Sequence, residues 1–287
     1  MNNKILVIGG TGMVGSAVVA ELKQINANYV VLTRNKDKVE ELTAQGIPSV
    51  VGDLGDLSTI ESAIKEVNTI FLATSPAAYM LDLHKGLIDM AVENKVEKIV
   101  RLSAEPANYS EGLYMYQQHS EADEYLKQSG LTYAILRPHY FMQNIMMHIE
   151  SVKAQNMFAQ YSGDAKIPMI DVRDIAKVAA LALTMEEFNN QTCVLTGPES
   201  ISYADIAKEL SNILDRGIQY VDISYEDQEA GFKSFRMQDW QLSTVMNLFK
   251  IWADKGINEA TNDFDAITNS KATSIKRFLE DHIQYFN

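Results

Sequence analysis

Short apolar segments alternate with helix-forming segments through the first half of the chain. The apolar segments span three to five residues and are rich in β-branched side chains, which is typical of strands buried on both faces of a parallel sheet. Because parallel strands need crossover connections, this alternation predicts right-handed βαβ units and an α/β fold with a doubly wound parallel sheet. We expect strands at residues 4–8, 29–33, 49–51, 69–73, 98–102 and 132–136, and helices at 13–24, 36–45, 58–65, 78–94 and 115–128.

The alternation loosens beyond about residue 156. A helix is still expected at 171–184, where Asp171 and Asp174 stand at capping-box spacing, and a strand at 192–196. Further helices are expected at 203–214 and 275–283. We therefore expect a first domain in residues 1–155, to which 171–197 return, and a smaller, mostly helical lobe built mainly from 156–287.

A glycine-rich turn joins the first expected strand to the first expected helix. Gly10, Gly12 and Gly15 fit G-x-G-x-x-G, and Gly9, Gly12 and Gly15 fit G-x-x-G-x-x-G. In this context glycines permit a tight turn, let backbone N–H groups approach a pyrophosphate, and let the helix pack closely on the strand. The alternative is a glycine-rich turn without a ligand. The pattern favours a Rossmann domain whose cofactor contacts here are Gly9, Thr11, Gly12, Met13, Val14 and Gly15.

The end of the second expected strand bears on which dinucleotide is bound. A free ribose 2′-hydroxyl usually meets Asp or Glu there, whereas this chain has Arg34 between Thr33 and Asn35. A guanidinium can fork onto a 2′-phosphate, and no carboxylate is present to repel it. NADP(H) is therefore favoured over NAD(H). The alternative is an arginine that faces solvent or pairs with a nearby acid.

Composition and charge limit the partners. The chain has 287 residues, 46% of them hydrophobic, and a formal charge of -13, with no basic cluster on any expected helix, so we expect no nucleic-acid or membrane partner. No apolar run approaches the roughly 18 residues of a spanning helix. The single Cys193, the polar start of the chain and the absence of a leader pattern favour a cytoplasmic protein. Five scattered histidines supply no metal-ligand spacing, so no metal site is expected.

Several motifs together resemble the NmrA-like branch of the atypical short-chain dehydrogenases. They are GGTGMVG at 9–15, TRN at 33–35, GDLGD at 52–56, HSEADEYLKQSGLTYAILRPHYFMQN at 119–144 and DVRDIA at 171–176. The resemblance covers roughly residues 4–197, and the tail diverges. It implies an NAD(P)H-dependent quinone or triphenylmethane-dye reductase, or an NADP-binding regulator without turnover.

The resemblance also implies further cofactor contacts along the strand ends. Asp53, with Leu54, would meet the adenine, although Asp53 could equally cap the next helix. Ala73, Thr74 and Ser75 end the fourth expected strand and would lie beside the ribose and pyrophosphate, although this segment also fits an ordinary turn. Pro138, His139 and Tyr140 follow the sixth expected strand and would bring backbone near the nicotinamide.

The catalytic pattern departs from that of a typical short-chain dehydrogenase, which has a serine on strand five and Tyr-x-x-x-Lys on the next helix. Ser103 stands at the strand end and Tyr116 lies 13 positions later, but Ser120 occupies the lysine position, and Lys127 is nearly three turns away. Without a neighbouring cation Tyr116 should keep a pKa of about 10 and relay protons poorly. His119 opens the family's helical block. The catalytic candidates are Ser103, His119 and Tyr116, with Ser103 equally well explained as a strand-end hydrogen-bonding group.

This departure limits the chemistry. Reduction of a simple ketone builds charge on one oxygen and needs a positioned acid, whereas a quinone or dye cation spreads or cancels the charge as hydride arrives. Such a reductase needs mainly a held nicotinamide and an apolar slot for a flat acceptor. Candidate slot residues are Tyr79, Phe141, Phe232 and Trp240, although Phe141 also fits a core position and Trp240 a buried helix stripe.

We therefore expect an oxidoreductase that passes hydride from NADPH to a flat conjugated small molecule such as a quinone. The competing hypothesis is a nucleotide-sensing protein that binds NADP(H) and acts through a protein partner without turnover. The incomplete catalytic set lends support to this second hypothesis, whereas the acidic chain without a basic helix argues against direct DNA binding by such a regulator. The oligomeric state stays open, with a homodimer as one option.

Overall fold

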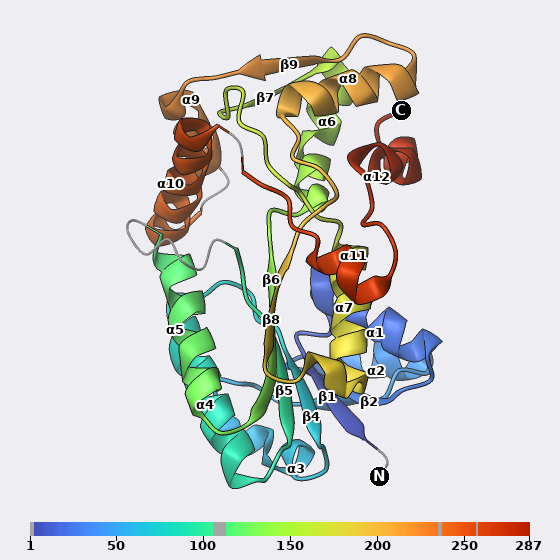
Figure 1. Ribbon diagram of the computed structural model, residues 1–287, viewed down its shortest axis with the longest axis vertical. Coiled ribbons are helices and arrows are strands. Elements are labelled where there is room, and N and C mark those ends of the chain that lie inside the picture. Colours follow the sequence, from blue (N-terminus) through green and yellow to red (C-terminus); the bar gives the residue numbers. More distant parts are fainter. Residues whose placement is uncertain (1–2, 106–112, 235–236, 257) are drawn as a thin grey trace. The chain divides into compact units, whose positions relative to one another are not determined.

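The computed structural model describes residues 3–105, 113–234, 237–256 and 258–287 (Figure 1). The chain divides into two compact units. One comprises Met1–Asn108, Tyr116–Pro138 and Val172–Val194, and the other comprises Tyr109–Met115, His139–Asp171 and Leu195–Asn287. The chain leaves the first unit after Pro138 and returns to it at Val172, whereas the sequence analysis placed the first of these boundaries near residue 155. Residues Met142–His148 and Ile149–Gln155 form helical elements, and the second of these packs on a strand of the second unit.

A seven-stranded sheet with the order β3-β2-β1-β4-β5-β6-β8 forms the centre of the first unit. Strand β1 pairs in parallel on both sides, with Ile5 opposite Tyr29 of β2 and Thr69 of β4. The strand order reverses there, which is the topological switch point of a doubly wound sheet. The predicted α/β fold is thus confirmed. The strands are β1 (Lys4–Ile8), β2 (Asn28–Thr33), β3 (Ser49–Val51), β4 (Thr69–Leu72), β5 (Lys98–Leu102), β6 (Thr132–Pro138) and β8 (Gln191–Leu195).

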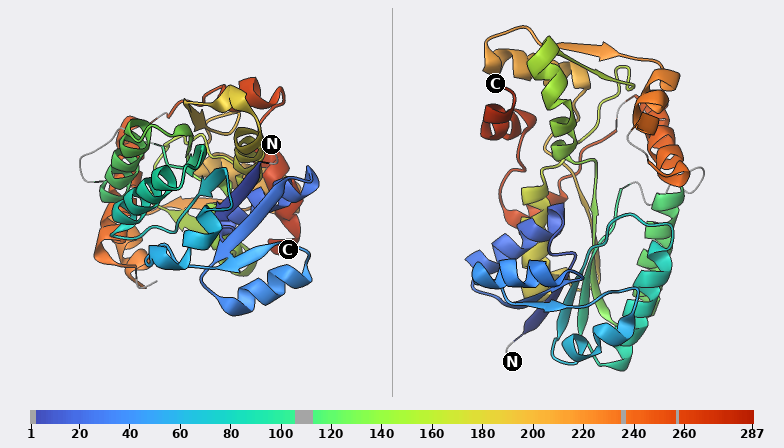
Figure 2. Two further views of the ribbon diagram at one scale, coloured as in Figure 1. Left: turned by 90° about the horizontal axis from the view of Figure 1, so that it is seen from below. Right: turned by 180° about the vertical axis from the view of Figure 1, so that it is seen from behind.

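Helices cover both faces of this sheet (Figures 1 and 2). Helices α1 (Met13–Gln24) and α7 (Val172–Thr184) pack against each other on one face, where the buried alanines of α7 allow a close approach. Helices α4 (Met80–Glu93) and α5 (Tyr114–Gln128) lie on the other face. There, leucine and isoleucine side chains from the strands and from α4 and α5 form one continuous core.

The helix expected at 58–65 is divided in two. Residues Leu57–Thr59 form a 3-10 turn, and α3 follows at Glu61–Ile64. Asp56 begins the turn, because its carboxylate accepts a hydrogen bond from the Ser58 amide at 3.2 Å. The exposed helix α2 (Lys36–Ala44) buries none of its residues and begins at Asn35, whose side chain accepts from the Asp37 amide at 2.8 Å.

The second unit is mostly helical. Strand β7 (Met157–Gln160) pairs in parallel with β9 (Gln219–Asp222), a short sheet that the sequence patterns did not predict. Helix α8 begins at a capping box formed by Ser202 and Asp205. The helical elements are η2 (Met142–His148), α6 (Ile149–Gln155), α8 (Tyr203–Leu214), α9 (Tyr225–Ser234), α10 (Asp239–Lys255), α11 (Asp263–Thr268), α12 (Ile275–His282) and η4 (Ile283–Tyr285).

Candidate functional site

The glycine turn between β1 and α1 packs too closely for side chains at three of its positions, Gly9, Gly10 and Gly15. Gly9 has a φ of +80°, and a Cβ there would lie 2.2 Å from the Ala73 carbonyl oxygen at the end of β4. A Cβ at Gly15 would lie 2.0 Å from the Gly9 carbonyl oxygen. The Gly12 amide donates to that same Gly9 oxygen at 2.9 Å. The hydrogen bond closes the turn, and the missing side chains let the start of α1 pack against it.

The N-terminus of α1 has no blocking side chain. Gly12 is the N-cap residue, no side chain caps the first turn, and the first turn contains no acidic residue. Thr11, Gly12 and Met13 are exposed, whereas Val14 and Gly15 are buried. A Cβ at Gly12 would meet only the Gly9 oxygen, at 3.3 Å, so this end of the helix is open. The helix dipole and unpaired amides of such an end favour an anion.

Arg34 follows β2 directly and is exposed. Among the residues that the structure describes, its side chain forms no ion pair or hydrogen bond, so the acid pairing weighed as an alternative is not found. Asp53 is half-buried and its carboxylate accepts from the Gly55 amide at 2.9 Å, with Leu54 half-buried beside it. Because Asp56 caps the next helical turn, the expectation that Asp53 might cap it instead is wrong. Its contact with adenine stays a prediction.

The end of β4 carries a hydroxyl that is linked to a buried histidine. Ala73 is buried, Ser75 is exposed, and the half-buried Thr74 has its Oγ1 2.9 Å from Nε2 of His84 on α4. His84 is 1% exposed. Burial lowers the pKa of His84 well below its ordinary value, and the nearby Arg101 lowers it further. His84 is therefore neutral at pH 7.

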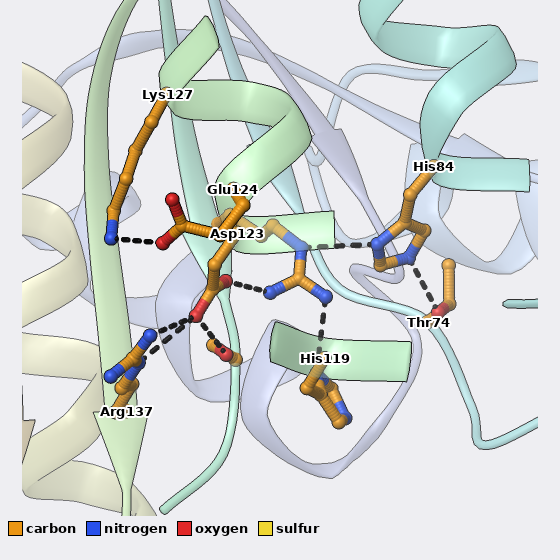
Figure 3. A network of polar contacts seen from close by, with 9 residues as sticks. Thr74, His84, His119, Asp123, Glu124, Lys127 and Arg137 are labelled. Atoms are coloured by element: carbon orange, nitrogen blue, oxygen red, sulfur yellow. Dashed lines mark hydrogen bonds and ion pairs between the residues drawn. The ribbon is translucent and has the colours of Figure 1, made fainter. Parts of the chain in front are cut away.

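A buried ionic cluster joins β5, β6 and α5 (Figure 3). Arg101 and Asp123 form an ion pair with both side chains fully buried, and Arg137 binds the other oxygen of Asp123 through Nε at 2.9 Å. Ser103 Oγ donates to that same oxygen at 2.9 Å. One carboxylate thus serves two guanidinium groups and a hydroxyl. The proton of the predicted catalytic residue Ser103 points to Asp123.

The same arginine contacts two imidazoles. Arg101 Nε donates to His84 Nδ1 at 3.1 Å, and Arg101 Nη2 lies 3.1 Å from Nδ1 of the half-buried His119. Burial lowers the pKa of His119 well below its ordinary value, and Arg101 and Arg137 lower it further. The sequence reasoning selected His119 and Ser103 but missed Arg101, Asp123, Arg137 and His84. The signal was an arginine within the apolar segment KIVRL, because a charge on a buried strand needs a buried partner.

Tyr116 and Lys127 are not paired with each other. Tyr116 is buried, at 7% exposure, and Ser120 is half-buried one turn later. Lys127 Nζ binds Glu124 Oε1 at 2.7 Å (Figure 3). The described structure therefore places the lysine in an ion pair with a glutamate of the same helix.

Several predicted contact residues form an aromatic cluster in the second unit. The His139 ring stacks on Trp252 at a centroid distance of 5.3 Å, and Tyr140 meets the edges of Trp252 and Phe249. Phe232 stacks on Phe249 at 6.4 Å. Burial lowers the pKa of His139 to about 3 and raises that of Tyr140 to about 12. The cluster is packed and uncharged at pH 7.

The remaining predicted residues differ in exposure. Tyr79 in the first unit is 59% exposed, whereas Pro138 at the end of β6 is buried, and its carbonyl accepts from the Glu105 amide at 2.9 Å. In the second unit Phe141 is half-buried, and the Trp240 indole N–H donates to Gln238 Oε1 at 2.7 Å. The described residues contain no group of three His, Cys, Asp or Glu side chains that could hold a metal ion. None of their helices is long and apolar enough to cross a membrane.

The fold and the open glycine turn define a doubly wound α/β protein of the dinucleotide-binding class. Residues 1–279 match the family model described as the NmrA-like family, and the chain belongs to this family. It is 28% identical over 282 residues to an NAD(P)H azoreductase of Xenophilus azovorans, covering 98% of this chain and 99% of that protein.

Solved structures show the same fold at lower identity. The crystal structure of the NADPH-dependent quinone oxidoreductase of Escherichia coli complexed with NADPH matches with a TM-score of 0.87 and 23% identity, covering 97% of this chain and 99% of that one. The triphenylmethane reductase of Citrobacter sp. complexed with NADP(H) matches with a TM-score of 0.86 and 17% identity, over 97% and 99% of the two chains.

Proposed function

We propose that this protein is an NAD(P)H-dependent reductase that prefers NADPH and passes hydride to a flat conjugated acceptor such as a quinone. The observation that carries the proposal is the open N-terminus of α1 behind a turn that only glycines fit. This helix end suits a pyrophosphate, because its first turn has no side-chain cap and no acidic residue, so that backbone amides are left for an anion. Relatives named for azo and quinone reduction support the same class of reaction.

The preference for NADPH rests on Arg34. Its exposed guanidinium follows β2, where a dinucleotide-binding sheet presents the adenine ribose, and it is not engaged by an acid of the described chain. A 2′-phosphate would gain a forked, charge-assisted contact there. NADH lacks this phosphate and would gain nothing from the arginine.

The groups near Tyr116 support the proposed class of acceptor. Tyr116 is buried, and the lysine of the same helix, Lys127, forms an ion pair with Glu124. An acceptor whose reduction spreads charge over a conjugated system needs only hydrogen-bond donors, and His119 offers one. We propose that His119 orients the acceptor, that Ser103 and Tyr116 support its surroundings, and that Tyr79 contacts its rings. Phe141, Phe232 and Trp240 of the second unit stay predicted acceptor contacts. The bound nucleotide supplies the hydride.

The test is a turnover assay on the purified protein. NADPH is mixed with a panel of quinones and azo dyes, and the loss of absorbance of the reduced nicotinamide is followed. We expect oxidation that depends on the acceptor and is faster with NADPH than with NADH. Gly12→Val, which places a branched side chain over the open helix end, should abolish it. Tight NADPH binding with no turnover for any acceptor would instead support the sensor that acts through a protein partner.

A further inference from the structure

We propose that Arg101 is a positioning residue that holds His84 and His119 as neutral imidazoles protonated at Nε2. In this arrangement Thr74 and His119 are hydrogen-bond donors for the bound nucleotide and the acceptor. The proposal deepens the proposed function and rests on it for the identity of those two ligands. The tautomers themselves do not depend on the function.

The first step is the hydrogen-bond chemistry of the guanidinium. An arginine has only N–H donors and no acceptor, so any ring nitrogen that it contacts must carry a lone pair. Arg101 contacts His84 Nδ1 and His119 Nδ1, each at 3.1 Å. Both Nδ1 atoms are therefore unprotonated, and in a neutral ring the proton is then on Nε2.

The second step is the charge around the two rings. His84 lies on α4, His119 and Asp123 on α5, Arg101 on β5 and Arg137 on β6. Asp123 neutralises one of the two guanidinium groups, so the cluster keeps a net positive charge next to both imidazoles. A further positive charge on either ring would be buried beside Arg101, which favours the neutral form. The lowered pKa values of both histidines agree with this.

The third step leads from His84 to Thr74. Because Nε2 of His84 carries the proton, it donates to Thr74 Oγ1 at 2.9 Å (Figure 3). The threonine oxygen is then an acceptor toward the histidine, and its own proton is left for another partner. No described residue accepts it. Thr74 follows β4, beside the glycine turn that packs on Ala73, so this donor stands where a nucleotide phosphate or ribose would lie.

The fourth step concerns His119. Its Nε2–H has no hydrogen-bond partner among the described residues, and Figure 3 shows the ring with this nitrogen turned away from the cluster. A neutral imidazole N–H can hydrogen-bond to a quinone oxygen but does not supply a proton at pH 7. In a balanced reaction the bound nucleotide would supply the hydride and the solvent would supply one proton, so that a quinone would leave as hydroquinone. A plot of the reduction rate against pH should then show no transition near pH 6.5 that arises from His119.

The test is a measurement of the imidazole nitrogens by long-range ¹H–¹⁵N correlation NMR. The chain has five histidines, and His84→Gln and His119→Gln assign the two signals. In the wild-type protein we expect protonated Nε2 and bare Nδ1 at both residues, unchanged from pH 8 to pH 5.5. A charged His119 at pH 7, or a proton on Nδ1 of either residue, would overturn the proposal without any variant being needed.

A matched pair of variants tests the role of Arg101. Arg101→Lys keeps a positive charge beside Asp123 but lacks the planar fork that reaches both rings. In this variant at least one of the two imidazoles should become a mixture of tautomers. The KM for NADPH should rise about tenfold, and kcat should fall about tenfold. Arg137→Lys changes the other cation of Asp123, which contacts neither ring in the described structure, and should leave both tautomers in place.

The two proposals fail in different ways. Fixed Nε2–H tautomers in a protein that turns over no acceptor would remove the reductase and leave the tautomers established. Turnover that is unaffected in Arg101→Lys, with both tautomers retained, would remove the positioning role alone. Thr74→Val, which has the same shape without the hydroxyl, should raise the KM for NADPH while kcat changes little, and an unchanged KM would separate Thr74 from the nucleotide.

Discussion

The stability of the second unit should depend on pH through one buried histidine. His148 is 8% exposed, its ring lies 4.9 Å from that of Phe158, and its Nε2 has no hydrogen-bond partner in the described structure. Burial lowers its pKa to about 4. In the unfolded chain a histidine has a pKa of about 6.5. Between these values the unfolded chain binds a proton that the folded chain does not.

The sign and size of the effect follow from this difference. The contribution of His148 is fully present above about pH 6.5 and is lost as the pH falls toward the folded pKa, because protons then favour the unfolded state. One pKa unit corresponds to about 1.4 kcal/mol. The free energy of unfolding should therefore fall by about 2 kcal/mol from this residue alone between pH 7.5 and pH 5.

His148→Phe removes the titrating group and keeps an aromatic ring beside Phe158. At pH 7.5 the variant should be as stable as the wild type or about 1 kcal/mol more stable, since a buried unsatisfied nitrogen is removed. By pH 5 its advantage should have grown by about 2 kcal/mol. Urea unfolding followed by tryptophan fluorescence measures this, because Trp240 and Trp252, the two tryptophans of the chain, lie in the same unit.

The control is Phe158→Leu, which alters the packing of the same ring pair without changing any titrating group. It should lower the free energy of unfolding by about 1–2 kcal/mol at every pH. If the curves of the wild type and of His148→Phe stay parallel from pH 7.5 to pH 5, the argument from His148 is refuted.

Three further predictions concern the first unit. Gly15→Ala should lower the melting temperature and weaken nucleotide binding, because the added Cβ would lie 2.0 Å from the Gly9 oxygen, whereas Gly217→Ala, with nothing within 4 Å, should do neither. Arg34→Asp should weaken NADPH about tenfold or more and NADH less in a binding titration, and an unchanged preference would exclude Arg34 from the site. Asp123→Leu leaves two buried guanidinium groups without a carboxylate and should cost about 3–5 kcal/mol in chemical unfolding, and a loss below about 1 kcal/mol would contradict the buried pairing.

Local patterns were enough to predict the sheet and the glycine turn. The strands at 4–8, 49–51 and 98–102 and the helix at 13–24 have the bounds that the sequence predicted. These elements could be found because apolar period, β-branching and glycine position all act within a few residues. The single helix predicted at 58–65 was wrong in its bounds, because a 3-10 turn at Leu57–Thr59, capped by Asp56, precedes the short helix Glu61–Ile64.

The polar cluster could not be assembled from sequence, because its members meet only when three elements pack on β5. Asp123 lies 22 positions from Arg101 and 14 from Arg137. Which of them share a face depends on strand register and on helix rotation. The aromatic cluster of the second unit could not be assembled from sequence either. His139 stacks on Trp252 and Tyr140 makes an edge contact with it, although this tryptophan lies on a helix more than a hundred positions away.

A single carboxylate on α5 that binds arginines from two strands also has a consequence for local opening. Lifting α5 from the sheet would strip Asp123 from Arg101 and Arg137 at once, and lifting α4 would remove His84 from the same guanidinium. Partial opening at any one of these elements therefore leaves a charged or polar side chain of another element without its partner. The backbone amides of α4, α5, β5 and β6 should exchange with deuterium as one cooperative group, more slowly than those of the exposed helix α2.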